Sequence, residues 1–423
     1  MQIVVLTLFG KDLKLQACFS IVFTLGFGVA KIPGVSIMSS AFFFKNRLSF
    51  CLGLYCATML FTCLGVWWFS AIPSMQVLCV FISCFLSSWV YGALVTYIEG
   101  RQKTETLLAV LAGLFIYAGN ISRGTASLIL QLGCPPLLMP IACGLATCPL
   151  ACLLLVLVDR QPGPSIEDIR KRSKRQPMSS EERNAFCWEF SIGLSTMIIS
   201  YALMTGLRSF RDFYPQQIFS AAMKEDNVPS WVFFIVDLPG AILSCFALVF
   251  MNRIEGNQTA IRMLFLFQIS ACAFAFASTL LFEAGLLSGM IWQVTLGIGI
   301  FVSYTLMQTP VFDRLFAATK TKGTCTFLIF MSDFFGYIAT VVLLFYQNFG
   351  PETSSGDDGN QKVLDLYKGV LFAGLILITA LLATSLVFFG NKLKVYDENG
   401  KREHVENPQF GDAEDSEGLV GRT

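Results

Sequence analysis

Long apolar runs separated by short polar breaks make up most of the chain between residues 15 and 390. Each run has about 20 residues and hardly a charge, which suits a helix crossing the hydrocarbon core of a bilayer. Lipid offers the backbone no hydrogen-bond partner, and the runs are too long and too apolar for barrel strands. The pattern therefore predicts eleven membrane helices, at 15–38, 48–70, 75–98, 105–131, 136–158, 186–210, 229–251, 260–282, 287–309, 323–347 and 366–390.

The composition supports an all-α polytopic membrane protein, because 54% of the 423 residues are hydrophobic and 14% are charged. One histidine argues against a histidine metal centre, and thirteen of the fourteen cysteines lie in or beside predicted helices rather than in a secreted disulfide framework. The sequence has no P-loop, metal-ligand cluster or nucleophile–base pair. We therefore expect no catalytic residue, no metal, no cofactor and no nucleic-acid partner.

One long charged segment, residues 159–185, interrupts the helices and predicts the orientation. Its seven Lys and Arg residues make it a cytoplasmic linker under the positive-inside rule. If the helices on either side of the linker cross the membrane in alternating directions, 21 basic residues lie on the cytoplasmic side and 7 on the opposite side. The linker separates a half of five helices (1–158) from a half of six (186–390), and an acidic tail (391–423), predicted to be disordered, follows in the cytoplasm.

Five helices against six is an unequal division for a fold of two equivalent halves. The first ten residues are too short to span a membrane and lack the basic start and cleavage site of a signal peptide. We therefore expect a further helix upstream of Met1.

Several motifs carry a resemblance to a known family. They are "YIEGRQKTE" (97–105), the linker stretch that ends in "RKRSKRQPMSSEERNAF" (170–186), "LRSFRDFYPQQIF" (207–219), "FDRLFAA" (312–318) and "FLIFMSDFFGYIATVVLLFYQNFG" (327–350). In these motifs the chain resembles an uncharacterised major-facilitator-like family within the major facilitator superfamily.

The resemblance implies the major facilitator fold with twelve helices, so that helix 15–38 is the second of twelve. Two features depart from it. The first helix, which carries an Arg-Lys pair in the family, is missing. The glycine-aspartate-arginine loop signature of the superfamily is replaced by "FFFKNRLSF" (42–50). A weaker similarity, in the stretch around Lys31, is to the second helix of organophosphate:phosphate antiporters.

Four charges lie well inside predicted helices: Lys31, Arg123, Asp237 and Asp333. A charge at mid-bilayer costs roughly 2.5–3.5 kcal/mol, so each needs a partner, a cavity or a route to the surface. From the helix rise, Lys31 and Asp333 lie about 10 and 15 Å from the cytoplasmic end, whereas Arg123 and Asp237 lie about 12 Å from the outer end. The charges thus form two depth-matched sets of opposite sign.

In the arrangement that the resemblance implies, helix 2 faces helix 11 and helix 5 faces helix 8 between the halves. We therefore predict the pairs Lys31–Asp333 and Arg123–Asp237 across that boundary, as gates that break alternately during rocking of the halves. Other interpretations stay open. Lys31 can snorkel to the surface, and Asp237 and Asp333 can be neutral or carry a coupling proton. Pro33 and Gly34 either break helix 2 beside Lys31 or only kink it.

The outer end of the seventh helix carries Arg208, Arg211 and Asp212, spaced at i, i+3 and i+4 and predicted to share one face. Two guanidinium groups suit phosphate or carboxylate oxygens. An ion pair at the outer face is the favoured alternative for Arg211 and Asp212. Substrate contact and a structural role are equally open for Arg208.

Helices 4, 7 and 10 line the cavity in the superfamily, and here they carry Tyr201, Tyr304 and Gln308 among other polar and aromatic residues. Glu99 and Arg101 at the cytoplasmic end of helix 4, and Asp313 and Arg314 at that end of helix 10, are predicted to form intracellular locks between the halves.

These observations predict a secondary-active transporter that works by alternating access on a small organic anion, an organic phosphate or carboxylate. Protons or phosphate would serve as the coupling or counter ion, and the plasma membrane is the expected location. The first alternative is a proton-coupled carrier of a neutral or cationic nutrient. The second is a receptor or scaffold on the same fold.

Overall fold

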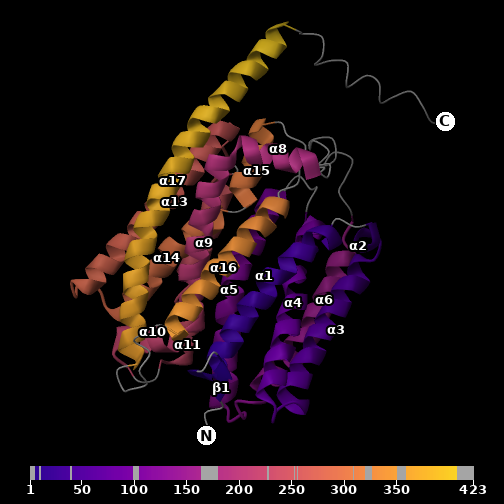
Figure 1. Cartoon of the computed structure of the whole chain (residues 1–423), viewed down its shortest axis with the longest axis vertical. Helices are drawn as coiled ribbons and strands as arrows, with labels where there is room; N and C mark the ends of the chain where they lie inside the picture. Colours follow the sequence, from indigo (N-terminus) through magenta and orange to yellow (C-terminus); the bar gives the residue numbers. More distant parts are fainter. Residues whose placement is uncertain are drawn as a thin grey trace, which may run out of the picture.

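The computed structural model describes residues 5–8, 11–38, 41–98, 104–162, 180–225, 228–251, 253–254, 256–307, 309–319, 326–349 and 359–406. The helices form two groups that follow the order of the chain, indigo and purple for the first half and magenta to yellow for the second (Figure 1).

The N-terminal half begins with a short antiparallel hairpin, in which Val5 pairs with Lys14, that the sequence analysis did not predict. Its elements are β1 (Val5–Leu8), β2 (Lys11–Lys14), α1 (Leu15–Met38), α2 (Ala41–Lys45), α3 (Arg47–Cys63), the π-helical turn η1 (Leu64–Trp68), α4 (Pro73–Ile98), α5 (Thr104–Gln131) and α6 (Met139–Asp159).

The C-terminal half follows the linker. Its elements are α8 (Ser180–Glu189), α9 (Ser191–Phe213), α10 (Pro215–Met223), α11 (Ser230–Ile235), α12 (Leu238–Met251), α13 (Asn257–Glu283), α14 (Gly289–Met307), α15 (Thr309–Thr319), α16 (Thr326–Phe349) and α17 (Gly359–Glu406).

The described residues include nine helices long and apolar enough to cross a membrane, and a tenth span if α8 and α9 are counted together. The 28-residue α5 provides the length of an eleventh. Each of the eleven predicted runs thus corresponds to helix in the structure. Apart from the N-terminal hairpin, the elements of the described residues are all helical, and the protein is an all-α membrane protein.

Two of the predicted helices are not single straight helices. The run predicted at 186–210 is divided at Phe190, where α8 turns by 87° into α9, since Phe190 has a non-helical backbone. The run predicted at 229–251 is interrupted at Val236 and Asp237, between α11 and α12. Pro239 explains this break, because proline has no N–H to donate to the preceding turn, so the hydrogen-bond ladder of α11 cannot continue through it.

Two further expectations need correction. The stretch after residue 390 is not disordered from its start, because α17 continues to Glu406, and residues 407–423 lie outside the described residues. Charged residues that form helices well let α17 extend beyond its apolar part. Pro33 does not break its helix either, since α1 is continuous from Leu15 to Met38.

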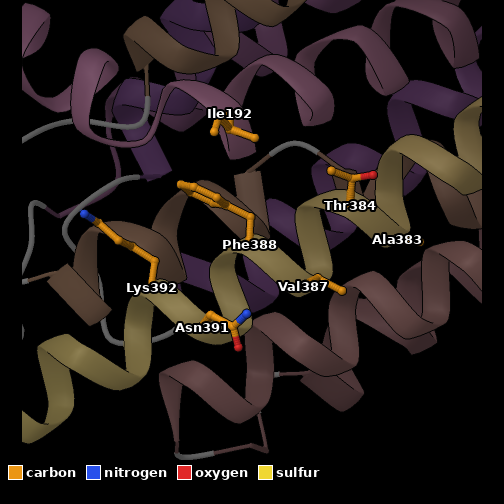
Figure 2. Close-up of a pocket in the computed structure, with 7 residues that line it drawn as sticks. All are labelled: Ile192, Ala383, Thr384, Val387, Phe388, Asn391 and Lys392. Carbon is orange, nitrogen blue, oxygen red and sulfur yellow. The ribbon is translucent and has the colours of Figure 1, made fainter.

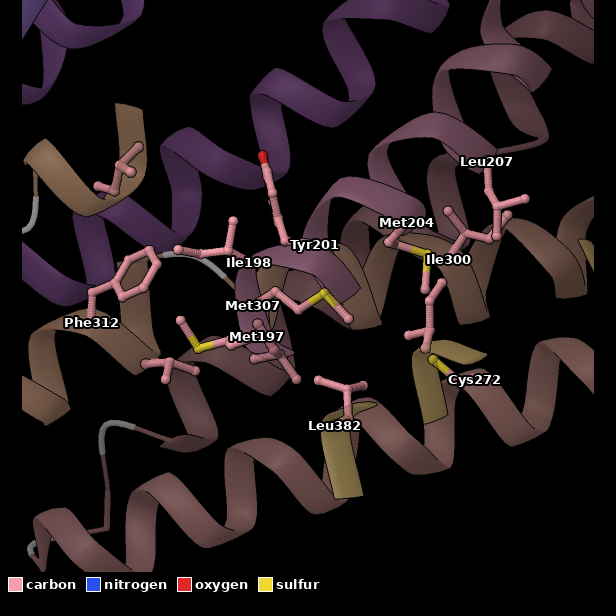
Figure 3. Close-up of a cluster of buried hydrophobic side chains, with 14 of the residues drawn as sticks. Met197, Ile198, Tyr201, Met204, Leu207, Cys272, Ile300, Met307, Phe312 and Leu382 are labelled. Atoms are coloured by element: carbon pink, nitrogen blue, oxygen red, sulfur yellow. The ribbon is translucent and has the colours of Figure 1, made fainter. Parts of the chain in front are cut away.

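The core lies mainly within the C-terminal half. Met197, Met204 and Leu207 on α9 pack with Cys272 on α13 and Ile300 on α14 (Figure 3). Each of these side chains is almost completely buried. Large apolar side chains elsewhere on the helices, Phe246 at 68% exposure among them, face outward, as lipid contact requires.

The two halves meet along two pairs of elements. In Figure 1, α1 of the first half lies beside α16 of the second, and the two pack together. Behind them, α5 packs against α11 and α12. These are the facing pairs predicted from the resemblance, and they bring the four intramembrane charges to the boundary between the halves.

Candidate functional site

One stripe of polar side chains runs along α9 at the boundary between the halves. Tyr201, Thr205, Arg208 and Asp212 follow a spacing of four, three and four residues, so they lie on one side of the helix. Thr205 packs against Gly336 of α16. At a rise of 1.5 Å per residue, Tyr201 and Arg208 are about 10 Å apart along the axis. The whole stripe, from Tyr201 to Asp212, therefore extends over about three turns of α9.

At one end of the stripe, Lys31 of α1 pairs with Asp333 of α16. Lys31 Nζ lies 3.1 Å from Asp333 Oδ2, and the two side chains are 5% and 12% exposed. Lys31 Nζ also lies 4.8 Å from the centre of the Phe330 ring, a cation–π contact. The predicted pair is thus present, and the snorkelling alternative for Lys31 is wrong in this conformation because the ammonium group is buried.

Two tyrosines continue from this pair along the boundary. The Tyr201 hydroxyl lies 2.8 Å from Asp333 Oδ1 and 2.9 Å from the Tyr304 hydroxyl. In Figure 3 the ring of Tyr201 points away from the apolar cluster, with its hydroxyl toward the purple ribbon of the N-terminal half. The Tyr304 ring in turn lies 4.6 Å from the guanidinium carbon of Arg208. The Lys31–Asp333 pair is therefore connected to Arg208.

At the other end lies a group that we call the arginine cluster: Arg123, Arg208, Arg211, Asp212 and Asp237. Arg123 Nη1 lies 2.9 Å from Asp212 Oδ1, and its Nη2 lies 3.5 Å from Asp237 Oδ2. Asp212 Oδ2 lies 3.5 Å from Arg208 Nε. Arg123 comes from the N-terminal half and the others from the C-terminal half. The predicted Arg123–Asp237 contact is present, but Asp212 is the nearer partner of Arg123.

Arg211 and Asp237 form the most deeply buried ion pair in the cluster. Arg211 Nη1 lies 2.7 Å from Asp237 Oδ1, and both side chains are almost fully buried. The guanidinium also donates to the side-chain and backbone oxygens of Gln293 on α14, at 2.9 and 3.1 Å. A Cβ on Gly297 would lie 2.9 Å from Asp237 Oδ1, so this glycine leaves room for the carboxylate. Gln293 and Gly297 thus hold the pair within the C-terminal half.

Two sequence-based expectations for the charged residues need correction. Arg211 and Asp212 do not form an ion pair at the outer face, because successive residues point about 100° apart around a helix. Asp212 faces Arg123 between the halves, whereas Arg211 faces the core. The structure also holds the Lys31–Asp333 and Arg123–Asp237 contacts together, so alternate breakage is not seen in this conformation.

Arg208 has hydrogen-bonding capacity that the protein leaves unused. Its Nε and Nη1 atoms are buried and donate to no acceptor, although Asp212 is near. Arg123, by comparison, donates to Asp212 and to the Asn120 side-chain oxygen. A buried donor without a partner is costly, so such atoms are rare in folded proteins. Arg208 is therefore the cation of the cluster best suited to receive a ligand.

The expected intracellular locks are described only in part. Glu99 and Arg101 lie outside the described residues, as does Gln308. Arg314 donates to the Asn257 side chain and the Met251 carbonyl, so these two bonds stay within the C-terminal half. Asp313 lies beside it on α15.

One contact between the halves escaped sequence analysis. The Ser127 hydroxyl of α5 lies 2.7 Å from the Ser230 hydroxyl of α11, and Gln131 donates to Ser230 at 2.6 Å. Serine and glutamine in a helix are too common to predict such a bond. Asn120, Gly297 and Ser230 therefore join the site on geometry alone.

A groove of about 790 Å³ lies elsewhere, between α9 and α17. Figure 2 shows Ile192, Val387 and Phe388 along it, with Asn391 and Lys392 at one end. None of its lining residues belongs to the arginine cluster or contacts the Lys31–Asp333 pair. It is therefore separate from the boundary between the halves.

Comparison with solved structures shows the same fold. A bacterial homologue of the iron transporter ferroportin, in an outward-facing state, matches with a TM-score of 0.51 at 15% identity, over 87% of this chain and 89% of that one. The human organic anion transporter MFSD10 (TETRAN) matches with a TM-score of 0.50 at 13% identity, over 86% of this chain and 83% of that one. The fold is thus that of the major facilitator superfamily.

Sequence comparison identifies the family. No curated protein sequence matches the chain. A family model, described as a family of unknown function (DUF5690), matches residues 5–392. Because this match covers nearly the whole chain, the protein belongs to the family of unknown function DUF5690.

Proposed function

We propose that the protein is a secondary-active transporter of a small organic anion, an organic phosphate or carboxylate, that works by alternating access. The anion binds at Arg208 and Arg123, between the two halves. The observation that carries this proposal is that two buried nitrogens of Arg208, Nε and Nη1, donate no hydrogen bond. A planar guanidinium with free donors suits the oxygens of carboxylate and phosphate groups.

The charge balance of the arginine cluster supports an anionic ligand. Three arginines face two aspartates, so the ionised cluster carries one net positive charge inside the protein. A charge in a low-dielectric region attracts a counterion strongly. Exchange for phosphate, or uptake with protons, would limit the charge moved across the membrane in each cycle.

Alternating access fits the position of the ion pairs. Lys31–Asp333 joins α1 to α16, and Arg123 joins α5 to the break between α11 and α12, so both contacts cross the boundary that must open and close. Interrupted helices at the interface of two repeats are typical of transporter binding sites. The two structural neighbours named above are a homologue of an iron transporter and an organic anion transporter, so the fold is compatible with ligands of either charge.

We place the protein in the plasma membrane, with the linker and the C-terminus in the cytoplasm. The excess of Lys and Arg on the linker side supports this orientation. Lys31–Asp333 would then lie nearer the cytoplasm and the arginine cluster nearer the outside.

Uptake by proteoliposomes containing the purified protein tests the proposal. Radiolabelled phosphorylated and carboxylated solutes should enter, and Arg208→Ala should lower the initial rate of the transported solute by about tenfold or more, since it removes the free donors. Arg208→Lys should recover little, because an ammonium group cannot bind bidentately. Lys368→Ala, which removes a cation away from the boundary, is the matched control and should stay within about twofold. If Arg208→Ala transports the anion at the wild-type rate, this site is wrong.

A second candidate is a proton-coupled carrier of a neutral or cationic nutrient. It is favoured by Asp333, whose carboxylate faces both Lys31 and the Tyr201 hydroxyl and offers a place for a proton. The same liposomes distinguish the two candidates. Uptake of a neutral solute driven by an inward proton gradient, lost in Asp333→Asn, would favour the second.

A crosslink at the boundary tests whether the halves must separate. Ser127→Cys with Ser230→Cys should form a disulfide on oxidation, because the two hydroxyls touch across α5 and α11. We expect oxidation to lower the uptake rate at least about fivefold and dithiothreitol to restore it. Each single variant is a control for the native thiols and should be unaffected. Full uptake by the crosslinked protein would contradict separation of the halves at this place.

A further inference from the structure

We infer that Asp212 is an internal stand-in for the substrate anion: its carboxylate occupies the position between Arg123 and Arg208 that the anion takes when it binds. This inference rests on the proposed function and deepens it, since it identifies the group that the substrate must displace.

The position of Asp212 supports this role. Its two oxygens point at different guanidinium groups, Oδ1 at Arg123 of the N-terminal half and Oδ2 at Arg208 of the C-terminal half. A carboxylate between two arginines of opposite halves has the geometry expected of a bound substrate carboxylate. The position between the two arginines is thus held by a group that resembles the proposed ligand.

Asp212 holds this position weakly on the Arg208 side. Arg208 Nε lies 3.5 Å from Asp212 Oδ2 in an ion pair that is not a hydrogen bond, so Nε and Nη1 still donate no hydrogen bond. The carboxylate is tethered to the same helix, one turn away, and cannot approach both arginines equally well. A free anion has no such tether and can satisfy the donors that Asp212 leaves open.

Asp237 is the contrasting carboxylate in the cluster. It is 1% exposed and held by Arg211 at 2.7 Å within its own half, whereas Asp212 is 24% exposed. Displacing Asp237 would leave the buried Arg211 without its charge partner, but displaced Asp212 can turn toward solvent. Of the two carboxylates beside Arg123, Asp212 is therefore the one that can leave.

The location of Asp212 in α9 also argues against a helix-stabilising role. It lies in the last turn, where the helix dipole disfavours a negative charge. The helix dipole therefore does not account for this charge, and its charge partners are the two arginines.

Removing the charge of Asp212 should strengthen anion binding, because an internal competitor lowers apparent affinity by the fraction of sites it occupies. We propose to titrate the purified full chain with inorganic phosphate and with succinate at constant ionic strength, following the thermal unfolding midpoint. Asp212→Asn should lower the half-saturating concentration about 3- to 30-fold relative to wild type. Asp212→Glu, which keeps the competing charge, should stay within about threefold. Glu283→Gln, which removes an acidic group from the Lys368 pair, is the matched control and should match wild type.

The outcomes separate this inference from the proposed function. If wild type binds either anion but Asp212→Asn binds it equally or more weakly, the stand-in role is wrong while the anion site stands. If Asp212→Asn gains affinity and the gain survives Arg208→Ala in the same chain, the role is also wrong, because the gain then arises elsewhere. If neither anion shifts the midpoint of wild type or of Asp212→Asn, both this inference and the anion site are overturned. A cooperative unfolding transition in each variant shows that it is folded.

Discussion

Lys31→Asp and Asp333→Lys are each expected to lower uptake at least about tenfold, and combining them is expected to recover part of it. Each single change places two like charges at a buried position that holds an ion pair of 3.1 Å in the wild type, where repulsion is little screened. The double variant restores opposite charges across α1 and α16. Initial uptake rates in proteoliposomes, at matched protein content, measure the effect.

Recovery in the double variant should be partial, because Asp333 also accepts a hydrogen bond from the Tyr201 hydroxyl. A lysine at position 333 cannot accept that hydrogen bond. Tyr201→Phe isolates that loss and should be milder than either charge reversal. A double variant that performs no better than the weaker single variant would show that the Lys31–Asp333 contact is not what transport requires.

The intramembrane charges were the most predictable part of the site. A charge in an apolar run stands out because it is costly there, and its depth follows from counting residues along the helix. Together with the facing helices implied by the resemblance, this was enough to predict the contacts of Lys31 with Asp333 and of Arg123 with Asp237. Both lie within 3.5 Å in the structure.

The partners of Arg208, Arg211 and Asp212 were harder to predict because they depend on rotation around α9. Three residues within one turn look equivalent in sequence, yet Arg211 faces the core and Asp212 faces the other half. The side-chain carbonyl of Gln293 and the missing side chain of Gly297 decide which guanidinium meets Asp237. Neither residue is unusual in an apolar helix, so neither identifies itself in sequence.

The helices were likewise easier to predict than their interruptions. Hydropathy identifies a membrane span from its apolar content, which does not depend on the direction of the backbone. It therefore detects a straight helix, the helix broken at Asp237 and the helix bent after α8 equally well. Pro239 was a local signal for the first of these breaks. The bend at Phe190 has no such signal, and it follows from burial of Phe186 and Phe190 against Phe316 and Phe389.

Asp237→Leu is expected to be the most destabilising single change in the cluster. It leaves Arg211, which is 2% exposed, without a carboxylate partner, and breaking a buried ion pair from one side costs about 3–5 kcal/mol. Arg211→Met should lower the stability less, because Asp237 still has a second charge partner, Arg123, at 3.5 Å. The stabilities of the detergent-purified variants can be ranked by heating them and measuring the loss of the monodisperse peak in size-exclusion chromatography.

The double variant Arg211→Met with Asp237→Leu tests whether this pair is structural. It removes both buried charges, so it should be more stable than Asp237→Leu alone, as replacement of a buried pair by apolar groups often is. Its uptake should stay low, because Arg123 loses its contact with Asp237 and with it a link between α5 and the break before α12. Wild-type uptake by the double variant would mean that Asp237 serves only to neutralise Arg211, and that Arg123 and Asp212 join the halves without it.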